Sequence, residues 1–219
     1  MKRFWRDNGL SLVLFALFLI FWAGQALTGW RDEVADQRDH GAPPPTLVEY
    51  LGSGDFVEAT TENWESEFLQ MFAFVLFTAF LYQRGSAESK SPDQPAEVDR
   101  DPRLCRSSEA PGPVRTGGWR LRVYEHSLSL AFLTLFLISF ISHAMGGAAA
   151  YNEERRLHGG TEVSVWEYLM HARFWFQSFQ NWQSEFLAIW CMVVLTIFLR
   201  QRGSAESKPV DSPHKQTGG

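Results

Sequence analysis

Two long apolar runs constrain the fold of this 219-residue chain more than any other feature. They cover residues 9–27 and 128–150, and neither contains an Asp, Glu, Lys or Arg. Because an α-helix rises about 1.5 Å per residue, each run is about as long as the hydrocarbon layer of a membrane is thick. A composition of 45% apolar residues would also suit a soluble domain, but the clustering does not. The sequence therefore predicts an integral membrane protein.

Two shorter apolar runs lie at residues 68–81 and 186–199. At about 14 residues each, they are shorter than the ~20 residues that a spanning helix needs. Each becomes long enough only if its helix begins several residues earlier. The expected spanning helices are therefore about 9–29, 63–82, 127–150 and 181–200.

An internal repeat relates the two halves of the chain. A shift of 118 positions aligns residues 7–90 with residues 125–208 without a gap, and 34 of the 84 pairs are identical. Such similarity predicts a duplication. The expected fold is all-α: an integral membrane four-helix bundle built from two duplicated transmembrane hairpins. Both hairpins enter the membrane in the same orientation, so these are parallel repeats about an axis along the membrane normal.

The repeat also decides how the first helix is interpreted. Its basic N-terminus and the Gly24-Gln25-Ala26 segment resemble a secretory signal peptide. The equivalent helix in the second half is internal and cannot be removed as a signal. We therefore expect the first helix to remain in the protein.

Basic residues predict the orientation in the membrane. The N-terminus, the middle loop and the C-terminal tail together hold 15 of the 20 Lys and Arg residues, and the two other loops hold 5. Cytoplasmic loops carry the excess of Lys and Arg. The expected arrangement is multi-pass, with both termini and the middle loop in the cytoplasm.

The segments outside the hairpins differ in character. Residues 91–117 are rich in proline and charge, which predicts a disordered cytoplasmic linker, and the tail 209–219 has a similar composition. In the outer loops, the pattern from Thr46 to Glu49 and from Ser164 to Glu167 fits a capping box. We expect an amphipathic helix at the outer interface after each capping box, aromatic-rich in the second copy and interrupted after Leu51 in the first.

Four polar residues in the expected spans are candidates for a functional site: Gln25, Glu67, His143 and Glu185. Gln25 and His143 occupy equivalent repeat positions, as do Glu67 and Glu185, and all four are expected at a similar depth near the outer side of the membrane. A polar cluster there could bind a cation, pass protons or hold a small polar ligand, because ionisable residues inside membranes usually face the bundle interior. The alternative is a structural role. Asn63 and Asn181 would be N-cap residues, and each glutamate, in the first turn of its helix, would interact favourably with the helix dipole. His143 would form a hydrogen bond to a neighbouring helix.

Small residues also recur in register. Gly24 and Thr28 in the first copy correspond to Ser142 and Gly146 in the second. Small residues at this four-residue spacing allow close helix approach, so we expect a packing role.

Several other chemistries are not supported. No second helix supplies a histidine to pair with His126 or His143, so a bis-histidine haem is not expected. His40 and His158 occupy equivalent repeat positions in the acidic outer loops. They could belong to a weak metal site, or simply to a loop exposed to solvent. With only two cysteines, the chain cannot be a disulfide-stabilised scaffold. Its net charge of −5 does not indicate the basic surface that nucleic-acid binding requires. No cofactor, metal or catalytic residue is expected.

Three motifs carry a resemblance to a known family: Asn-Trp-Glu-Ser-Glu-Phe at 63–68, Glu-Tyr-Leu at 49–51 and Gln-Arg-Gly-Ser-Ala-Glu-Ser-Lys at 83–90. With them, nearly the whole chain resembles a family of small bacterial membrane proteins described only as a domain of unknown function. The resemblance implies a prokaryotic multi-pass membrane protein of the cytoplasmic (inner) membrane, and it supplies no catalytic or ligand residues.

The sequence favours a non-enzymatic membrane protein, an accessory or scaffold subunit in contact with the lipid bilayer. Its partner would be a second copy or another membrane protein. The alternative is a small transporter or channel with a site at Glu67 and Glu185. The Gly-Ser-Ala-Glu-Ser-Lys segments have no folding reason evident in the sequence. They indicate a recent duplication or a cytoplasmic docking motif.

Overall fold

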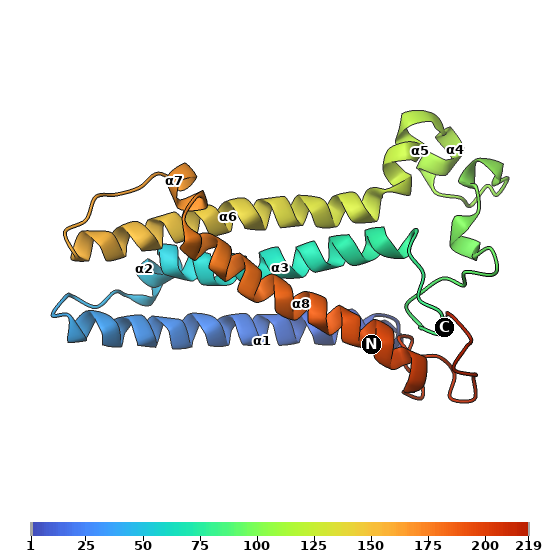
Figure 1. Cartoon of the computed structure of the whole chain (residues 1–219), viewed down its shortest axis with the longest axis horizontal. Coiled ribbons are helices and arrows are strands. Elements are labelled where there is room, and N and C mark those ends of the chain that lie inside the picture. Colours follow the sequence, from blue (N-terminus) through green and yellow to red (C-terminus); the bar gives the residue numbers. More distant parts are fainter. Residues whose placement is uncertain (1, 219) are drawn as a thin grey trace. The chain divides into compact units, whose positions relative to one another are not determined.

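The computed structural model describes residues 2–218, and within that range it contains helices, turns and loops but no strand. The expected all-α class is confirmed for these residues. The long helices are α1 (Lys2–Asp39), α3 (Gly54–Thr78), α6 (Ser127–Leu157) and α8 (Ala172–Phe198) (Figure 1). The short ones are α2 (Leu47–Leu51), η1 (Glu97–Asp99), η2 (Pro102–Leu104), α4 (Gly112–Thr116), α5 (Gly118–Glu125) and α7 (Val165–Leu169).

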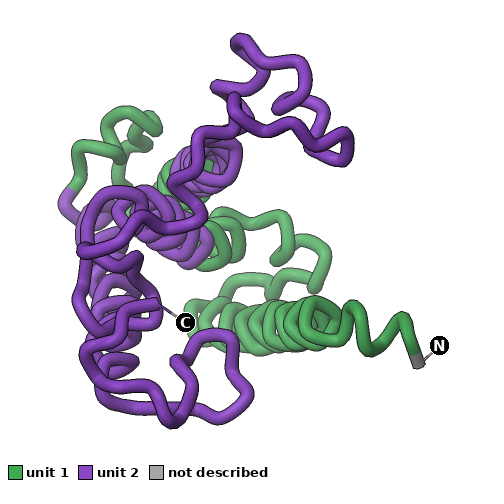
Figure 2. Tube along the Cα trace, turned by 90° about the vertical axis from the view of Figure 1, so that its right-hand side faces the viewer, with its two compact units in different colours: residues 1–61, 142–171 green, residues 62–141, 172–219 purple. Residues whose placement is uncertain are grey.

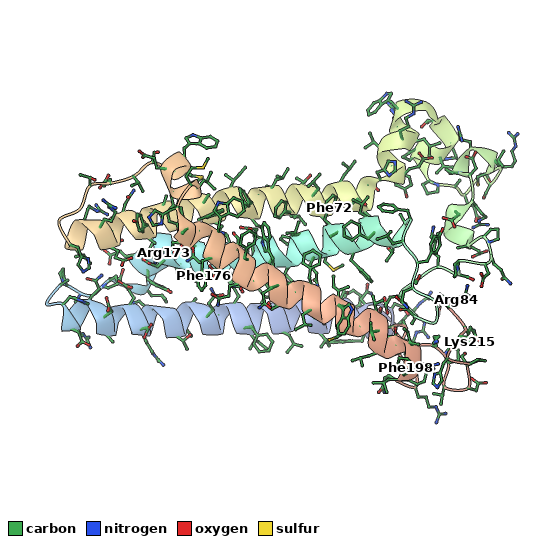
Figure 3. The ribbon with its side chains drawn as sticks, in the orientation of Figure 1. Phe72, Arg84, Arg173, Phe176, Phe198 and Lys215 are labelled. Atoms are coloured by element: carbon green, nitrogen blue, oxygen red, sulfur yellow. The ribbon has the colours of Figure 1, made fainter. Side chains whose placement is uncertain are left out.

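Three of the long helices, α1, α6 and α8, are long and apolar enough to cross a membrane. Almost none of the most apolar stretch of α1 or α8 is buried, and little of that of α6 is. On α8, for example, Phe176 and Phe198 are both exposed (Figure 3). Helix α3 is not among these candidate spans, because five acidic residues occupy its first fourteen positions.

Helices α3 and α8 begin nine residues earlier than the sequence predicted. Asn63 and Asn181 therefore lie inside these helices and do not cap them. Their backbone carbonyls instead accept hydrogen bonds of 2.8 Å from Ser66 Oγ and Ser184 Oγ, respectively. The apolar pattern begins only near Phe68, so it could not reveal a helix start that packing stabilises.

The two predicted capping boxes are confirmed. In α2 the Thr46 hydroxyl accepts from the Glu49 backbone N–H, and the Glu49 carboxylate accepts from the Thr46 backbone. Ser164 and Glu167 form the same pair at the start of α7. Each capped helix is only five residues long, and in the second copy most of the aromatic stretch belongs to α8.

The chain divides into two compact units, coloured separately in Figure 2. Unit 1 comprises residues 1–61 and 142–171, and unit 2 comprises residues 62–141 and 172–219. In unit 1 the start of α3 crosses α6 at glycines. A Cβ on Gly146 would lie 2.7 Å from the Glu58 backbone nitrogen, and a Cβ on Gly54 would meet the α6 backbone. The close approach predicted for Gly146 is confirmed, whereas Gly24 has open space around it.

In unit 2, aromatic rings fill the contact between the first part of α6 and α8. The Phe140 and Phe174 rings meet edge to face with centroids 5.3 Å apart, and Phe174 is fully buried. Phe136 packs similarly against Trp182. This packing gives α8 a reason to begin at Ala172, well before its apolar run.

The repeated segments that follow α3 and α8 fold into the same loop. Gly85 and Gly203 both have positive φ, 87° and 83°, which a glycine adopts without strain. The serines close the loop in both copies with equivalent hydrogen bonds: Gln83 N to Ser89 Oγ, Glu88 N to Ser86 Oγ, Gln201 N to Ser207 Oγ and Glu206 N to Ser204 Oγ. The structure thus supplies the folding reason for the Gly-Ser-Ala-Glu-Ser-Lys segments that the sequence did not reveal.

The last lysine of each loop holds the segment that follows it. Lys90 donates to the Ala79 carbonyl at 2.7 Å and pairs with Asp99. Lys208 is almost fully buried and donates to backbone carbonyls, among them those of Gly85 and Gln216. The disorder predicted for residues 91–117 and 209–219 stays a prediction.

Candidate functional site

Glu67 and Glu185 occupy matching positions in unit 2. Each lies thirteen residues beyond the first residue of its helix, α3 or α8. Glu67 is exposed and Glu185 is half-buried, and the two carboxylates are near enough to interact as like charges. The Gln70 amide donates a 3.1 Å hydrogen bond to the backbone carbonyl of Glu185, which ties α3 to α8 beside this pair.

Gln25 and His143, the other two predicted site residues, belong to unit 1. The Gln25 amide donates to the Thr60 hydroxyl at 3.3 Å, which links α1 to α3, and Thr60 is buried. His143 is fully buried in α6. The four-residue cluster stays a prediction, because Gln25 and His143 belong to unit 1 whereas Glu67 and Glu185 belong to unit 2.

Glu58 is a buried carboxylate that the sequence analysis missed. It is 6% exposed and accepts a 2.8 Å hydrogen bond from the hydroxyl of Tyr168. Gly147 makes room for this pair, because a Cβ there would lie 2.7 Å from both the Glu58 carboxylate oxygen and the Tyr168 hydroxyl. A buried carboxylate is costly without such a partner. The pair therefore joins α3, α6 and α7 in unit 1.

Glu65 is the second missed carboxylate. Its side chain is fully buried in unit 2 and accepts a 3.0 Å hydrogen bond from the indole N–H of Trp182. Glu58 and Glu65 are seven residues apart, about two helical turns, so they share one face of α3. That spacing was the available signal. It was missed because the repeat carries Phe176 and Gln183 at these positions.

The histidines shared by the two loops bond to their own helices. The His40 ring nitrogen Nδ1 lies 2.9 Å from the Asp36 carbonyl, and His158 Nδ1 lies 2.8 Å from the Glu154 carbonyl. Both interactions satisfy a carbonyl near the C-terminal end of a helix. Within residues 2–218, no group of three or more His, Cys, Asp or Glu side chains is arranged to hold a metal ion.

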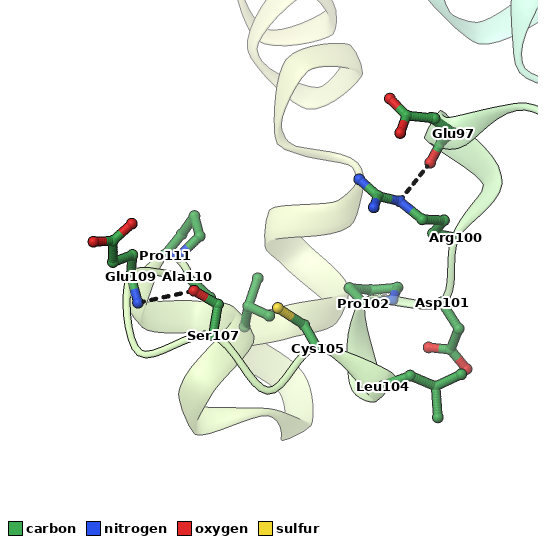
Figure 4. A pocket seen from close by; sticks show the side chains of 11 residues that line it. Glu97, Arg100, Asp101, Pro102, Leu104, Cys105, Ser107, Glu109, Ala110 and Pro111 are labelled. Carbon is green, nitrogen blue, oxygen red and sulfur yellow. Dashed lines mark hydrogen bonds between the residues drawn. The ribbon is translucent and has the colours of Figure 1, made fainter.

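A hollow of about 710 Å³ lies in the segment between the repeats (Figure 4). Its walls all come from residues 97–114. Local hydrogen bonds shape it, from Arg100 to the Glu97 carbonyl and from the Glu109 backbone N–H to Ser107. Cys105 at its edge is exposed. These residues form no arrangement of nucleophile, base and orienting group.

The fold and these sites define an all-α protein with three helices apolar enough to cross a membrane, which fits a membrane protein. The chain belongs to the family described as Domain of unknown function (DUF6766), which matches residues 1–219. The comparison with curated proteins found no match. The comparison with solved structures also found none.

Proposed function

We propose that the chain is a non-enzymatic multi-pass membrane protein that acts as an accessory or scaffold subunit. The pairing of its buried carboxylates carries this proposal: Glu58 bonds to Tyr168, and Glu65 bonds to Trp182. A solute pathway needs polar groups that exchange partners with water or solute. Carboxylates held by fixed side chains of neighbouring helices instead lock the helices together.

The proposed architecture is a four-helix bundle of two duplicated hairpins in the prokaryotic inner membrane, with both termini cytoplasmic. The apolar surfaces of α1, α6 and α8 support it, because a soluble monomer rarely exposes apolar patches of this size. In this arrangement α3 is the fourth span, entering the membrane near Trp64. The shared capping boxes and exit loops support the duplication.

The proposed partners follow from the same surfaces. Lipid covers most of the apolar face of α1. The aromatic side chains exposed on α8, among them Phe176 and Trp190, provide a docking face for a second copy or another membrane protein. Aromatic residues are enriched in such protein contacts.

A small transporter or channel remains the second candidate. The electrostatic interaction of Glu67 with Glu185 favours it, because two neighbouring carboxylates can attract a cation or share a proton.

Thiol labelling distinguishes the two candidates. Glu67→Cys and Glu185→Cys are introduced separately into a variant lacking Cys105 and Cys191 and probed from each side of the membrane. Lys215→Cys, in the exposed tail, reports labelling from the side of the C-terminus. The scaffold proposal predicts that cations do not change labelling and that reconstituted vesicles show no cation flux.

If both positions are labelled and a cation blocks this labelling, the scaffold proposal is overturned. Flux that is lost in Glu67→Gln and Glu185→Gln would do the same, and it would establish the transporter.

A further inference from the structure

An acidic cavity of about 430 Å³ lies in unit 1. It opens between the polar end of α1, the proline-rich loop, α2, the start of α3 and α6. Four carboxylates and one phenol line it: Glu33, Glu49, Asp55, Glu153 and Tyr50. Its volume falls in the lower part of the ~300–1,000 Å³ range of small-molecule sites.

The carboxylates of this cavity lack cationic partners. Within residues 2–218, no Lys, Arg or His side chain forms an ion pair with any of the four. Glu49 is engaged by Thr46 in the capping box, and Glu33 accepts a 2.7 Å hydrogen bond from the neutral Gln37 amide. The Asp55 carboxylate accepts a hydrogen bond from its own backbone N–H, and within residues 2–218 no other residue donates a hydrogen bond to Asp55 or Glu153.

Tyr50 provides an independent observation. Its side chain lines the cavity and is only 7% exposed, and its hydroxyl lies against Gly29, one helical turn before the cavity residue Glu33. No group within residues 2–218 forms a hydrogen bond with this hydroxyl. Buried tyrosine hydroxyls usually find a partner. A ligand in the cavity would supply one.

The charge of the cavity already shifts one of its groups. Burial, together with the negative charges of Glu33 and Glu153, raises the pKa of Asp55 to about 6. A bound cation would reverse this effect, because a positive charge within a few ångströms favours the carboxylate form.

We propose that this cavity binds a linear organic cation with two or more amino groups, of the polyamine class. Ammonium groups carry several hydrogen-bond donors, so a flexible polyamine can bridge Glu33, Asp55 and Glu153, which come from three different helices. A single metal ion fits less well, because within the described residues no three carboxylates converge on one point.

The equivalent positions of the second repeat reverse the charge. Tyr151 replaces Glu33, Arg155 replaces Gln37 and Arg173 replaces Asp55. The acidic character of the cavity is therefore not duplicated by the repeat, and one polyamine site per chain is expected.

The test is calorimetric titration of the full-length protein in nanodiscs of neutral lipid at pH 7.5 with spermidine, and with Mg²⁺ at matched ionic strength. Asp55→Asn and Glu153→Gln each remove one carboxylate, and exposed Glu153 can be changed without disturbing the fold. Tyr50→Phe removes only the hydroxyl. Asp39→Asn, on the exposed end of α1, is the charge-matched control.

We expect one spermidine per chain. Asp55→Asn and Glu153→Gln should weaken binding about tenfold or more, and Tyr50→Phe by a smaller factor. The Asp39→Asn variant should bind like the wild type. Three results would overturn the proposal: no spermidine binding, equal binding of Mg²⁺, or equal losses in Asp39→Asn and Asp55→Asn.

Discussion

Tyr168 and Tyr50 occupy equivalent repeat positions, but their hydroxyl groups differ in what they contact. The Tyr168 hydroxyl donates to Glu58, whereas the Tyr50 hydroxyl has no hydrogen-bond partner within residues 2–218. We predict that Tyr168→Phe lowers the free energy of unfolding by about 1–3 kcal/mol, because it removes a donor from a buried carboxylate. Denaturant unfolding of the detergent-solubilised protein measures this.

Tyr50→Phe is the matched control, and it should change the free energy of unfolding by much less than Tyr168→Phe. Equal losses in the two variants would show that the Tyr168–Glu58 hydrogen bond contributes nothing specific.

The raised pKa of Asp55 predicts how stability depends on pH. Burial is the main cause of the raised pKa, and the negative charges of Glu33 from α1, Glu153 from α6 and Glu58 from α3 itself add to it. Tyr50 lies near the Asp55 carboxylate from α2. A carboxyl whose pKa is higher in the folded than in the unfolded state stabilises the fold most below its unfolded pKa of 3.8. That contribution is lost as the pH rises through about 6.

Between pH 4 and pH 7 the wild type should therefore lose on the order of 1 kcal/mol of its free energy of unfolding through Asp55, after solvent screening. The Asp55→Asn variant should not show this loss. Melting temperatures of wild type and variant across this range provide the measurement. The same pH profile in both proteins would contradict the pKa assigned to Asp55.

The residues that hold the site together were only partly predictable. Glu67 and Glu185 were found because the repeat preserves them, and the structure places them within electrostatic reach of each other. Glu58 and Glu65 were not found, because their burial depends on Tyr168 and Trp182, which lie more than a hundred residues away. The seven-residue spacing places both glutamates on one face of α3, but it does not indicate which distant residues cover that face.

At the scale of helices, the crossing of α3 and α6 depends on glycine. A Cβ added to Gly146 would lie 2.7 Å from the Glu58 backbone nitrogen and 2.8 Å from a Val57 methyl, whereas one added to Gly24 meets nothing within 4 Å. Gly146→Ala should therefore destabilise the protein by about 1–3 kcal/mol.

Gly24→Ala is the matched control and should be neutral or slightly stabilising, because alanine favours helix. Thermal unfolding of the two variants tests the difference. Equal stability of the two variants would contradict the crossing.

Lys208 holds the C-terminal tail on the first exit loop. Its amino group donates to the Gly85 and Gln216 carbonyls, while Thr217 accepts from the Gly85 backbone N–H at 2.8 Å. Burial and the nearby charge of Arg200 lower the pKa of the Lys208 amino group. The backbone carbonyls that accept from it, which also include those of Pro213 and His214, offset this cost.

Lys208→Met should speed hydrogen exchange in residues 83–90 about tenfold. Lys215→Met, which changes an exposed residue of the same tail, should leave exchange unchanged. Equal exchange in wild type and Lys208→Met would show that the tail does not depend on this lysine.

The sequence predicted elements well where the signal is local. Both capping boxes were recognisable because four consecutive residues contain the whole hydrogen-bond pattern. The starts of α3 and α8 were not, because residues 54–62 are too polar to continue the apolar run. Their helical state depends on the contact of Gly54 with α6, and that of α8 on the burial of Phe174.

At the scale of the whole molecule, the number of membrane spans separates two accounts. Three helices meet the length and hydropathy that a span requires, and α3 falls short because of its acidic first half. We propose four spans, since α3 is the repeat partner of α8 and Trp182 pairs with the buried Glu65 carboxylate of the expected span. Three spans would place the two termini on opposite sides of the membrane.

Reporter fusions test this central claim most directly. A pair of topology reporters, one active only outside and one only in the cytoplasm, is fused after residues 41, 90, 159 and 219. We predict that residues 90 and 219 lie in the cytoplasm and that residues 41 and 159 lie outside. A reporter after residue 90 that behaves like the one after residue 41 would show that α3 does not cross the membrane, and would contradict the duplicated-hairpin architecture.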